Sequence, residues 1–373
     1  MITKTGPSFL DNEELRLIVF CGKGGVGKTT SAAATAMYLA KLRPEKKTLA
    51  ISTDPAHSLG DSLDYPLGPE SRPIPDVPNL WALEVDTPGL LEHFKRRHRR
   101  EIDRVIARAG IIHQVDVKEF LSLSLPEMDQ MLTFIEIARW LKANWFRPAD
   151  YDLIIIDTPP TGHLAKLLSV LETRAQWIEV FNAALDKYLF FNRKQGGFVD
   201  EFVEYLKVGL ETVEQLFKNG RETEFVPVTI PEAMSIAETE DLLAALEEKQ
   251  MPVRNIIVNR TPQAGGCALC SPRAEGQRGP VEEIEEKFGR YKLIFVPLFW
   301  HEIRGEEGLS RVGETLSGTA GRYRATTSIA AASGTLPVDT ATMADLLEKD
   351  LQFVLFSGKG GVGKTSMAAA TSL

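Results

Sequence analysis

Residues 22–30 read GKGGVGKTT, and this stretch decides the fold. It fits the pattern G-x-x-x-x-G-K-[ST], the loop that binds the phosphates of a nucleotide. The apolar run 15–20 (LRLIVF) precedes the loop, and the helix-forming run 29–42 follows it. The motif therefore stands in the strand, loop and helix setting that it requires, and it predicts a phosphate-binding site at this point of the chain.

The loop supplies both neutral and charged groups for an anionic ligand. Its glycines let consecutive backbone N–H groups turn inward around phosphate oxygens, and the start of the following helix adds a favourable dipole. Lys28 is expected to reach the β- and γ-phosphates, and Thr29 to place its hydroxyl on Mg²⁺. The predicted nucleotide-binding residues of the loop are Gly24, Gly25, Val26, Gly27, Lys28, Thr29 and Thr30.

A second lysine distinguishes this loop from most others of its kind. Lys23 follows the first glycine directly, where a cation is able to reach a nucleotide across an interface and act like an arginine finger. A solvated loop lysine is the alternative. The same lysine recurs as Lys359 in a second copy of the motif, which favours a functional role.

Two aspartates follow predicted strands and complete the candidate site. Asp157 closes the apolar run LIIID and occupies the position that holds Mg²⁺ in such folds, often through water. Asp54 follows the run 47–53 and is well placed to orient the attacking water or to contact Mg²⁺. The alternative for each aspartate is a helix N-cap or turn residue.

A tandem duplication sets the expected domain organisation. Residues 358–365 repeat the eight letters GKGGVGKT of residues 22–29, and the similarity extends to both sides. We expect one ATPase-like half over 1–311, with a helical insertion at about 164–235. A Gly-, Ser-, Thr- and Ala-rich linker over 312–350 and the start of a second half over 351–373 follow, so the chain is expected to be the N-terminal part of a longer protein.

Short apolar runs alternate with helical patterns through the first half. The expected strands are 15–20, 47–53, 80–86, 151–158, 253–260 and 292–298, with helices such as 29–42 and 125–145 between them. This alternation predicts an α/β fold of the P-loop NTPase class, a doubly wound and mainly parallel sheet with a helical insertion. Ligands of such sheets bind at the carboxyl ends of the strands.

Composition excludes several classes of function. The formal net charge of −8 argues against general binding to nucleic acid, which depends on Lys and Arg. No apolar run approaches the ~20 residues of a membrane helix, so the chain is not expected to be transmembrane. Three cysteines are too few for a disulfide scaffold, and we expect a reducing, cytoplasmic setting.

Taken together, these motifs closely resemble the ArsA-type ATPases over about residues 15–312. KGGVGKT (23–29) is similar to the signature of the deviant-Walker group, DPAHSL (54–59) to switch I, and DTPPTGH (157–163) to switch II. VNR (258–260) resembles the loop that reads the base, and VPLFW (296–300) the segment on its other side.

The resemblance implies Mg²⁺-dependent ATP hydrolysis at the interface of two facing halves. It implies that Asp54 positions water, that Asp157 contacts Mg²⁺ through water, and that Lys23 serves the opposing site. It also implies that Asn259 lies near the adenine, with Pro297 and Leu298 on the other side of the base. The partner is then a second ATPase half or a homodimer mate.

Two branches of this family fit the chain in different respects. The tandem loop is similar to the pump ATPases that drive arsenite or antimonite efflux through an integral membrane partner, and this is the favoured function, at the cytoplasmic face of a membrane. However, a soft metalloid requires cysteine ligands, and none occurs in the segments 121–130 and 164–218. The alternative is an ATPase that targets tail-anchored or other membrane proteins, which the aromatic-rich segment 177–217 would suit.

Cys267 and Cys270 form a CxxC pair after two glycines. Tetrahedral Zn²⁺ takes four ligands, so a facing pair would complete a zinc site. Capture of a metalloid, a redox switch and a pair of unmodified loop cysteines are the alternatives.

Overall fold

The computed structural model describes residues 7–54, 58–85, 128–141, 149–161, 197–262, 274–299, 301–318, 354–357, 367–369 and 371. The chain divides into two compact units, Met1–Thr319 and Ala320–Leu373. The sheet and the candidate site belong to the first unit.

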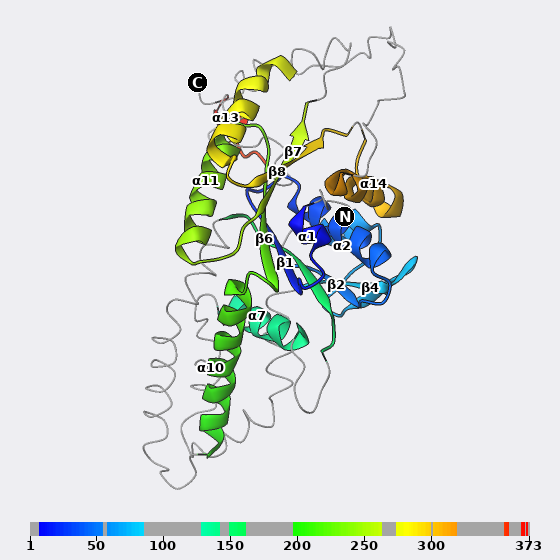
Figure 1. Ribbon diagram of the computed structural model, residues 1–373, viewed down its shortest axis with the longest axis vertical. Helices are drawn as coiled ribbons and strands as arrows, with labels where there is room; N and C mark the ends of the chain where they lie inside the picture. Colours follow the sequence, from blue (N-terminus) through cyan, green and yellow to red (C-terminus); the bar gives the residue numbers. More distant parts are fainter. Residues whose placement is uncertain are drawn as a thin grey trace, which may run out of the picture. The chain divides into compact units, whose positions relative to one another are not determined.

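A single twisted sheet organises the first unit (Figure 1). Its strands in the described ranges are β1 (Leu17–Cys21), β2 (Thr48–Ser52), β3 (Arg72–Ile74), β4 (Val77–Glu84), β5 (Leu153–Asp157), β6 (Thr223–Thr229), β7 (Asn255–Thr261) and β8 (Lys292–Pro297). They lie in the order β3-β4-β2-β5-β1-β6-β7-β8. β3 pairs antiparallel with β4, and every other pairing is parallel. The predicted α/β class with a mainly parallel sheet is confirmed.

Helices cover both faces of this sheet. The described helices are α1 (Ser8–Asp11), α2 (Lys28–Leu42), α3 (Ser58–Leu63), α7 (Met128–Leu141), α10 (Gly197–Lys218), α11 (Ala233–Glu248), α13 (Arg278–Phe288) and α14 (Gly305–Ser317). The core on one face joins the sheet to α1, α2, α3 and α14. The cores on the other face join it to α7, α10, α11 and α13 (Figure 1).

β1 shows why its sequence is apolar at every position. Leu17, Val19 and Cys21 point into the core beneath α7, α10 and α11, whereas Ile18 and Phe20 point into the core beneath α2. Successive side chains of a strand point to opposite faces, so a central strand covered on both sides needs no polar residue.

α2 and α14 pack closely on the same face of the sheet. Buried residues of α14 recur at Leu309, Val312 and Leu316, the spacing of one helical face. α2 is rich in buried alanines, and its small side chains permit the close approach. Because α2 begins at the phosphate loop, this packing also fixes the direction of the loop.

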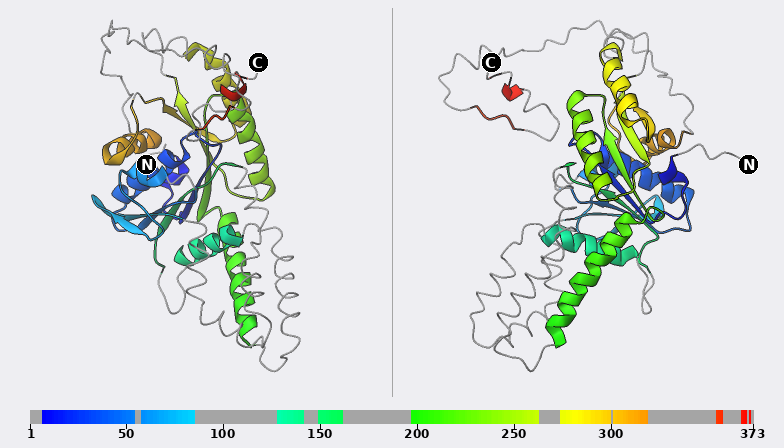
Figure 2. Two further views of the ribbon diagram at one scale, coloured as in Figure 1. Left: turned by 180° about the vertical axis from the view of Figure 1, so that it is seen from behind. Right: turned by 60° about the vertical axis from the view of Figure 1, so that its left-hand side comes forward.

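α10 extends well past the ends of the strands (Figure 2). Its C-terminal part contributes Leu210, Val213 and Phe217 to the core beneath the sheet. Among the residues with a described position, no helix is both long and apolar enough to cross a bilayer.

All six predicted strands occur, with ends within three residues of those expected. The predictions missed β3, which is short, and β6, which lies in the centre of the sheet beside β1. β6 contains Glu224 and Pro227, and proline in particular argues against a central strand. Because β6 falls within 164–235, the range predicted for the helical insertion was too long at its C-terminal end.

The second unit shows little regular structure in its described residues. The start of a second half was expected at 351–373, but residues 354–357 form no strand, and Leu355 is 93% exposed. A strand requires a neighbouring strand and a covered face, and the described residues of this unit supply neither. The second motif itself, with Lys359, lies outside the described residues.

The contact between α2 and α14 leads to a test of the fold. A Cβ added at Gly313 would lie 2.8 Å from Tyr38 Cβ and 3.2 Å from the Ala34 carbonyl oxygen, so Gly313→Ala must push the helices apart. We expect a loss of about 1–2 kcal/mol in the free energy of unfolding, measured by urea denaturation.

Gly308→Ala on the same helix is the matched control. Its nearest contact would be Ile303 at an ordinary 3.5 Å, and alanine favours the helix, so stability should stay equal or rise. Equal destabilisation by both substitutions would contradict the close packing described here.

Candidate functional site

The phosphate loop connects β1 to α2 at the carboxyl edge of the sheet. Gly27 has φ +98° and caps α2 without a side chain, so the first N–H groups of the helix face the loop. Gly22 has φ +140°, and a Cβ there would lie 2.3 Å from the Val228 carbonyl oxygen of β6. Glycine is therefore required at both ends of the loop, and the resulting concave backbone is suited to an anion.

Lys28 is buried at the base of this loop. Its side chain is 4% exposed, and its ammonium donates a hydrogen bond to the Lys23 carbonyl oxygen at 3.0 Å. Burial lowers the pKa of Lys28, while the nearby carboxylates of Asp157 and Asp54 act in the opposite direction. A cation that is this poorly hydrated is well placed to bind a phosphate group.

Asp157 ends β5 and is fully buried beside the loop. Its Oδ2 accepts hydrogen bonds from Thr29 Oγ1 at 2.7 Å and from Ser52 Oγ at 3.0 Å. Its Oδ1 has no hydrogen-bond partner among the described residues. An orphaned carboxylate oxygen beside a threonine hydroxyl is the donor set that Mg²⁺ prefers, so the residues present fit the predicted metal.

Burial raises the pKa of Asp157 to about 6, and the hydrogen bond from Thr29 and the charge of Lys28 oppose this rise. In an unfolded chain the same carboxyl group ionises near its ordinary value of 3.8. The folded state therefore binds this proton more tightly, and the ionised side chain lowers stability once the pH rises above about 4.

Asp54 and Ser58 border the same cluster. The backbone N–H of Asp54 donates to Ser52 Oγ at 3.3 Å, which places Asp54 just beyond the end of β2. Ser58 Oγ and Thr29 Oγ1 are 3.1 Å apart. The structure thus brings both predicted aspartates to the loop, from neighbouring strands of the sheet.

Asn259, in β7, contacts the loop directly. Its Nδ2 donates to the Val26 carbonyl oxygen at 2.8 Å. Pro297 ends β8 and pairs with Thr261, and the Leu298 N–H donates to the Thr261 carbonyl oxygen at 3.0 Å. The three residues predicted around a base therefore lie toward the carboxyl ends of the neighbouring strands β7 and β8, and Asn259 among them contacts the phosphate loop.

Lys23 does not extend freely from the loop. Its ammonium lies 3.0 Å from Glu238 Oε1 on α11, and Thr161 Oγ1 donates to Glu238 Oε2 at 3.3 Å. Pro160 lies against the loop as well, 3.6 Å from the position of a Cβ at Gly24.

Sequence reasoning missed Ser52, Ser58, Thr161 and Glu238 as site residues. Ser52 ends β2 just before the motif 54–59, and Ser58 lies within that motif at the start of α3. Both serines were therefore close to a signal that was assigned to Asp54 alone. Glu238 lies within the ordinary helical segment 233–248 and has no local motif. Only the pairing of β6 with β1 brings it to the loop.

Other predicted residues cannot be placed. Cys267 and Cys270 lie outside the described residues, so the zinc or metalloid site stays a prediction. Within the described ranges, no group of three or more His, Cys, Asp or Glu residues forms a metal site. Cys21 is a buried free cysteine at the end of β1, and burial raises the pKa of its thiol to about 12, which fits a structural role.

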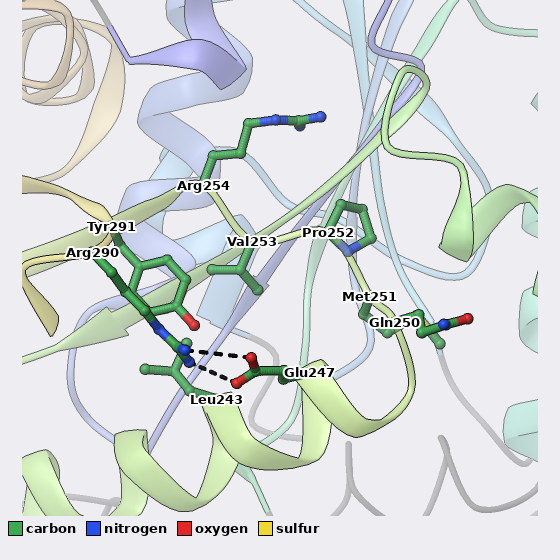
Figure 3. Close-up of a pocket in the computed structure, with 9 residues that line it drawn as sticks. All are labelled: Leu243, Glu247, Gln250, Met251, Pro252, Val253, Arg254, Arg290 and Tyr291. Carbon is green, nitrogen blue, oxygen red and sulfur yellow. Dashed lines mark hydrogen bonds and ion pairs between the residues drawn. The ribbon is translucent and has the colours of Figure 1, made fainter.

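A separate pocket of about 570 Å³ lies at the opposite edge of the sheet (Figure 3). The apolar part of its wall consists of Leu243, Met251 and Val253. Arg290 and Glu247, which also line the pocket, form an ion pair of 2.7 Å. Arg254, before β7, also lines the pocket and pairs with Glu224. Because β7 and β8 begin here, the pocket is not part of the phosphate site.

Comparisons with known proteins found similar sequences over most of the chain. The sequence profile of a family described as anion-transporting ATPase matches residues 15–318 and 351–373. The chain is 34% identical to ATPase GET3 of Podospora anserina over 324 residues, which covers 83% of this chain and 92% of that protein. It is 32% identical to ATPase get3 of Pyrenophora tritici-repentis, with coverage of 83% and 93%. It is 34% identical to ATPase GET3 of Chaetomium globosum, with coverage of 83% and 92%.

The raised pKa of Asp157 predicts a stability that depends on pH. Without nucleotide and with EDTA present, Asp157→Asn should raise the melting temperature at pH 8 by about 2–4 °C, because it removes a buried charge. This gain in melting temperature should shrink toward pH 5, where the Asp157 side chain of the wild type is mostly protonated. Melting curves across this pH range measure it.

Asp76→Asn is the control, because Asp76 is exposed in the turn between β3 and β4. Its melting temperature should equal that of the wild type at both pH values. A gain for Asp157→Asn that is the same at pH 5 and pH 8 would contradict the assignment of the effect to ionisation.

Proposed function

Because this chain belongs to the ArsA-type, anion-transporting ATPase family, we propose that it hydrolyses Mg-ATP in order to deliver membrane-protein segments. The proposed site of hydrolysis lies at the carboxyl ends of β1, β2 and β5. Membership of the family makes the chain an ATPase, and the particular cargo is the proposed part. The observation that carries the proposal is the cluster of Lys28, Thr29 and Asp157 beside a loop shaped for phosphate.

The loop and its neighbours account for binding of the triphosphate. Backbone N–H groups at the start of α2 donate hydrogen bonds to phosphate oxygens. The Lys28 ammonium gives up its hydrogen bond to the Lys23 carbonyl oxygen and donates to a phosphate oxygen instead. Thr29 and Asp157 would hold Mg²⁺, which supplies positive charge at the phosphates when bound. Asn259 supports the loop from β7 and is proposed to contact the adenine, with Pro297 and Leu298 beside it.

Catalysis then depends on positioning and on neutralising charge. We assign Asp54 the role of orienting the attacking water, since it lies at the end of β2 on the edge shared with Asp157. We assign Lys23 to the nucleotide of a facing half, either a second ATPase half or a second copy of this chain.

The likeness to ATPases named GET3 supports the branch that delivers tail-anchored proteins. The sequence favoured arsenite or antimonite efflux because of its tandem loop, and the relatives do not support that preference. The lack of cysteine in 121–130 and 164–218 agrees with the relatives, since a soft metalloid requires thiolate ligands. We propose a cytoplasmic site of action, with contact to a membrane receptor during delivery.

The assigned role of Asp54 predicts a loss of turnover that is separate from binding. Asp54→Asn should lower kcat by about 100-fold or more and change KM for ATP by less than about threefold, because the water loses its orienting carboxylate while the loop stays intact. Steady-state hydrolysis by the full chain measures both constants. Asp76→Asn should match the wild type, and a KM effect alone would contradict the role.

The proposed cargo predicts capture of a hydrophobic segment. A tail-anchored test protein released from detergent should remain soluble and crosslink to this chain in the presence of ATP. Lys28→Met should lose the capture, because the ATP-bound state is no longer reached. Sedimentation and crosslinking yield measure the outcome.

Arsenite and antimonite provide the opposing test. We expect ATP turnover by the full chain to stay unchanged when either anion is added. Several-fold stimulation by a metalloid, together with no capture of the tail-anchored segment, would reverse the choice between the two branches.

A further inference from the structure

β1 lies between β5 and β6, and the segments that follow these three strands meet above the sheet edge. The segment after β1 carries Lys23, the one after β5 carries Thr161, and α11 after β6 carries Glu238. The topology thus brings together three residues that are distant in the sequence.

Glu238 uses each carboxylate oxygen for a different segment. Oε1 forms the 3.0 Å ion pair with Lys23, and Oε2 accepts the 3.3 Å hydrogen bond from Thr161. The Lys23 carbonyl oxygen accepts from Lys28, which has to turn toward a phosphate when nucleotide binds. Lys23 is therefore held at its side chain by α11 and at its backbone by the phosphate-binding lysine.

The exposure of this ion pair indicates a contact that opens readily. The side chains of Lys23 and Glu238 are 26% and 37% exposed. Ion pairs of such exposure contribute little to stability, so a competing anion is able to displace the carboxylate.

We propose that Glu238 is a positioning residue that retains the Lys23 ammonium within its own subunit until the phosphates of a facing half compete for it. This inference rests on the proposed function, in which Lys23 acts on the opposing nucleotide. Thr161 fixes the orientation of the carboxylate, so movement of the segment after β5 weakens the hold on Lys23. Glu238 thereby limits turnover before the two halves have met.

Glu240 supplies a matched control on the same helix. It forms a 2.8 Å ion pair with Lys287 on α13, on the side of α11 away from the loop. Glu240→Gln removes the same charge from α11 and breaks a more exposed ion pair, but it leaves Lys23 untouched.

The first test measures the ion pair itself. The full chain without nucleotide is treated with an amine-acylating reagent, and the labelling rate of each lysine is followed by mass spectrometry. Glu238→Gln should speed labelling of Lys23 by about threefold or more, because the freed amine becomes accessible. Glu240→Gln should leave the labelling rate of Lys23 unchanged. An unchanged Lys23 rate in Glu238→Gln overturns the proposal.

The second test measures the effect on turnover at limiting protein concentration. Glu238→Gln should raise kcat about threefold with KM for ATP unchanged, and the increase should vanish in a Lys23→Met background. A kcat equal to that of Glu240→Gln, a loss of kcat, or an increase that persists without Lys23 overturns the positioning role. If the wild-type chain does not hydrolyse ATP, the proposed function fails, and the labelling rates still decide whether Glu238 holds Lys23.

Discussion

The hydrogen bonds from Thr29 and Ser52 to one oxygen of Asp157 are the constraint on which the site depends. They join the start of α2 and the end of β2 to the end of β5, and so fix the loop relative to two strands. The second oxygen remains unpaired within the described part of the chain, and burial keeps the pKa of this carboxyl high. The ionised carboxylate therefore destabilises the folded chain by itself, and a ligand that satisfies this oxygen would stabilise it.

The order of the strands extends this constraint to the rest of the catalytic edge. From β1 the chain passes through α2 to β2 on one side, and β6, β7 and β8 lie on the other. A ligand site is expected where the strand order reverses in this way. The reversal places β1 between β5 and β6. It also explains why a residue of α11 reaches a loop more than 200 positions earlier in the sequence.

Each part of the structure that could be predicted from the sequence is specified by the residues of that segment itself. The loop 22–30 requires glycine at positions 22 and 27 for steric reasons. The buried strands consist mostly of apolar residues, so their own composition predicts that they are buried. β6 escaped prediction because Glu224 and Pro227 interrupt its apolar pattern, although Glu224 is buried in the fold. Glu238 escaped prediction because its role depends on which strands are neighbours, and no short motif records strand order. Ser58 lies within the motif 54–59, whose chemistry was assigned to Asp54 alone.

The two lysines of the loop show how burial divides their tasks. Lys28 is almost fully buried and its pKa is lowered by desolvation, which suits its proposed contact with a phosphate of its own site. Lys23 is partly exposed and paired with an exposed carboxylate, which leaves it hydrated and able to change partners. A buried lysine cannot cross an interface without losing its packing, whereas an exposed one can. The difference in burial thus supports the proposed roles, in which Lys28 serves its own nucleotide and Lys23 serves that of a facing half.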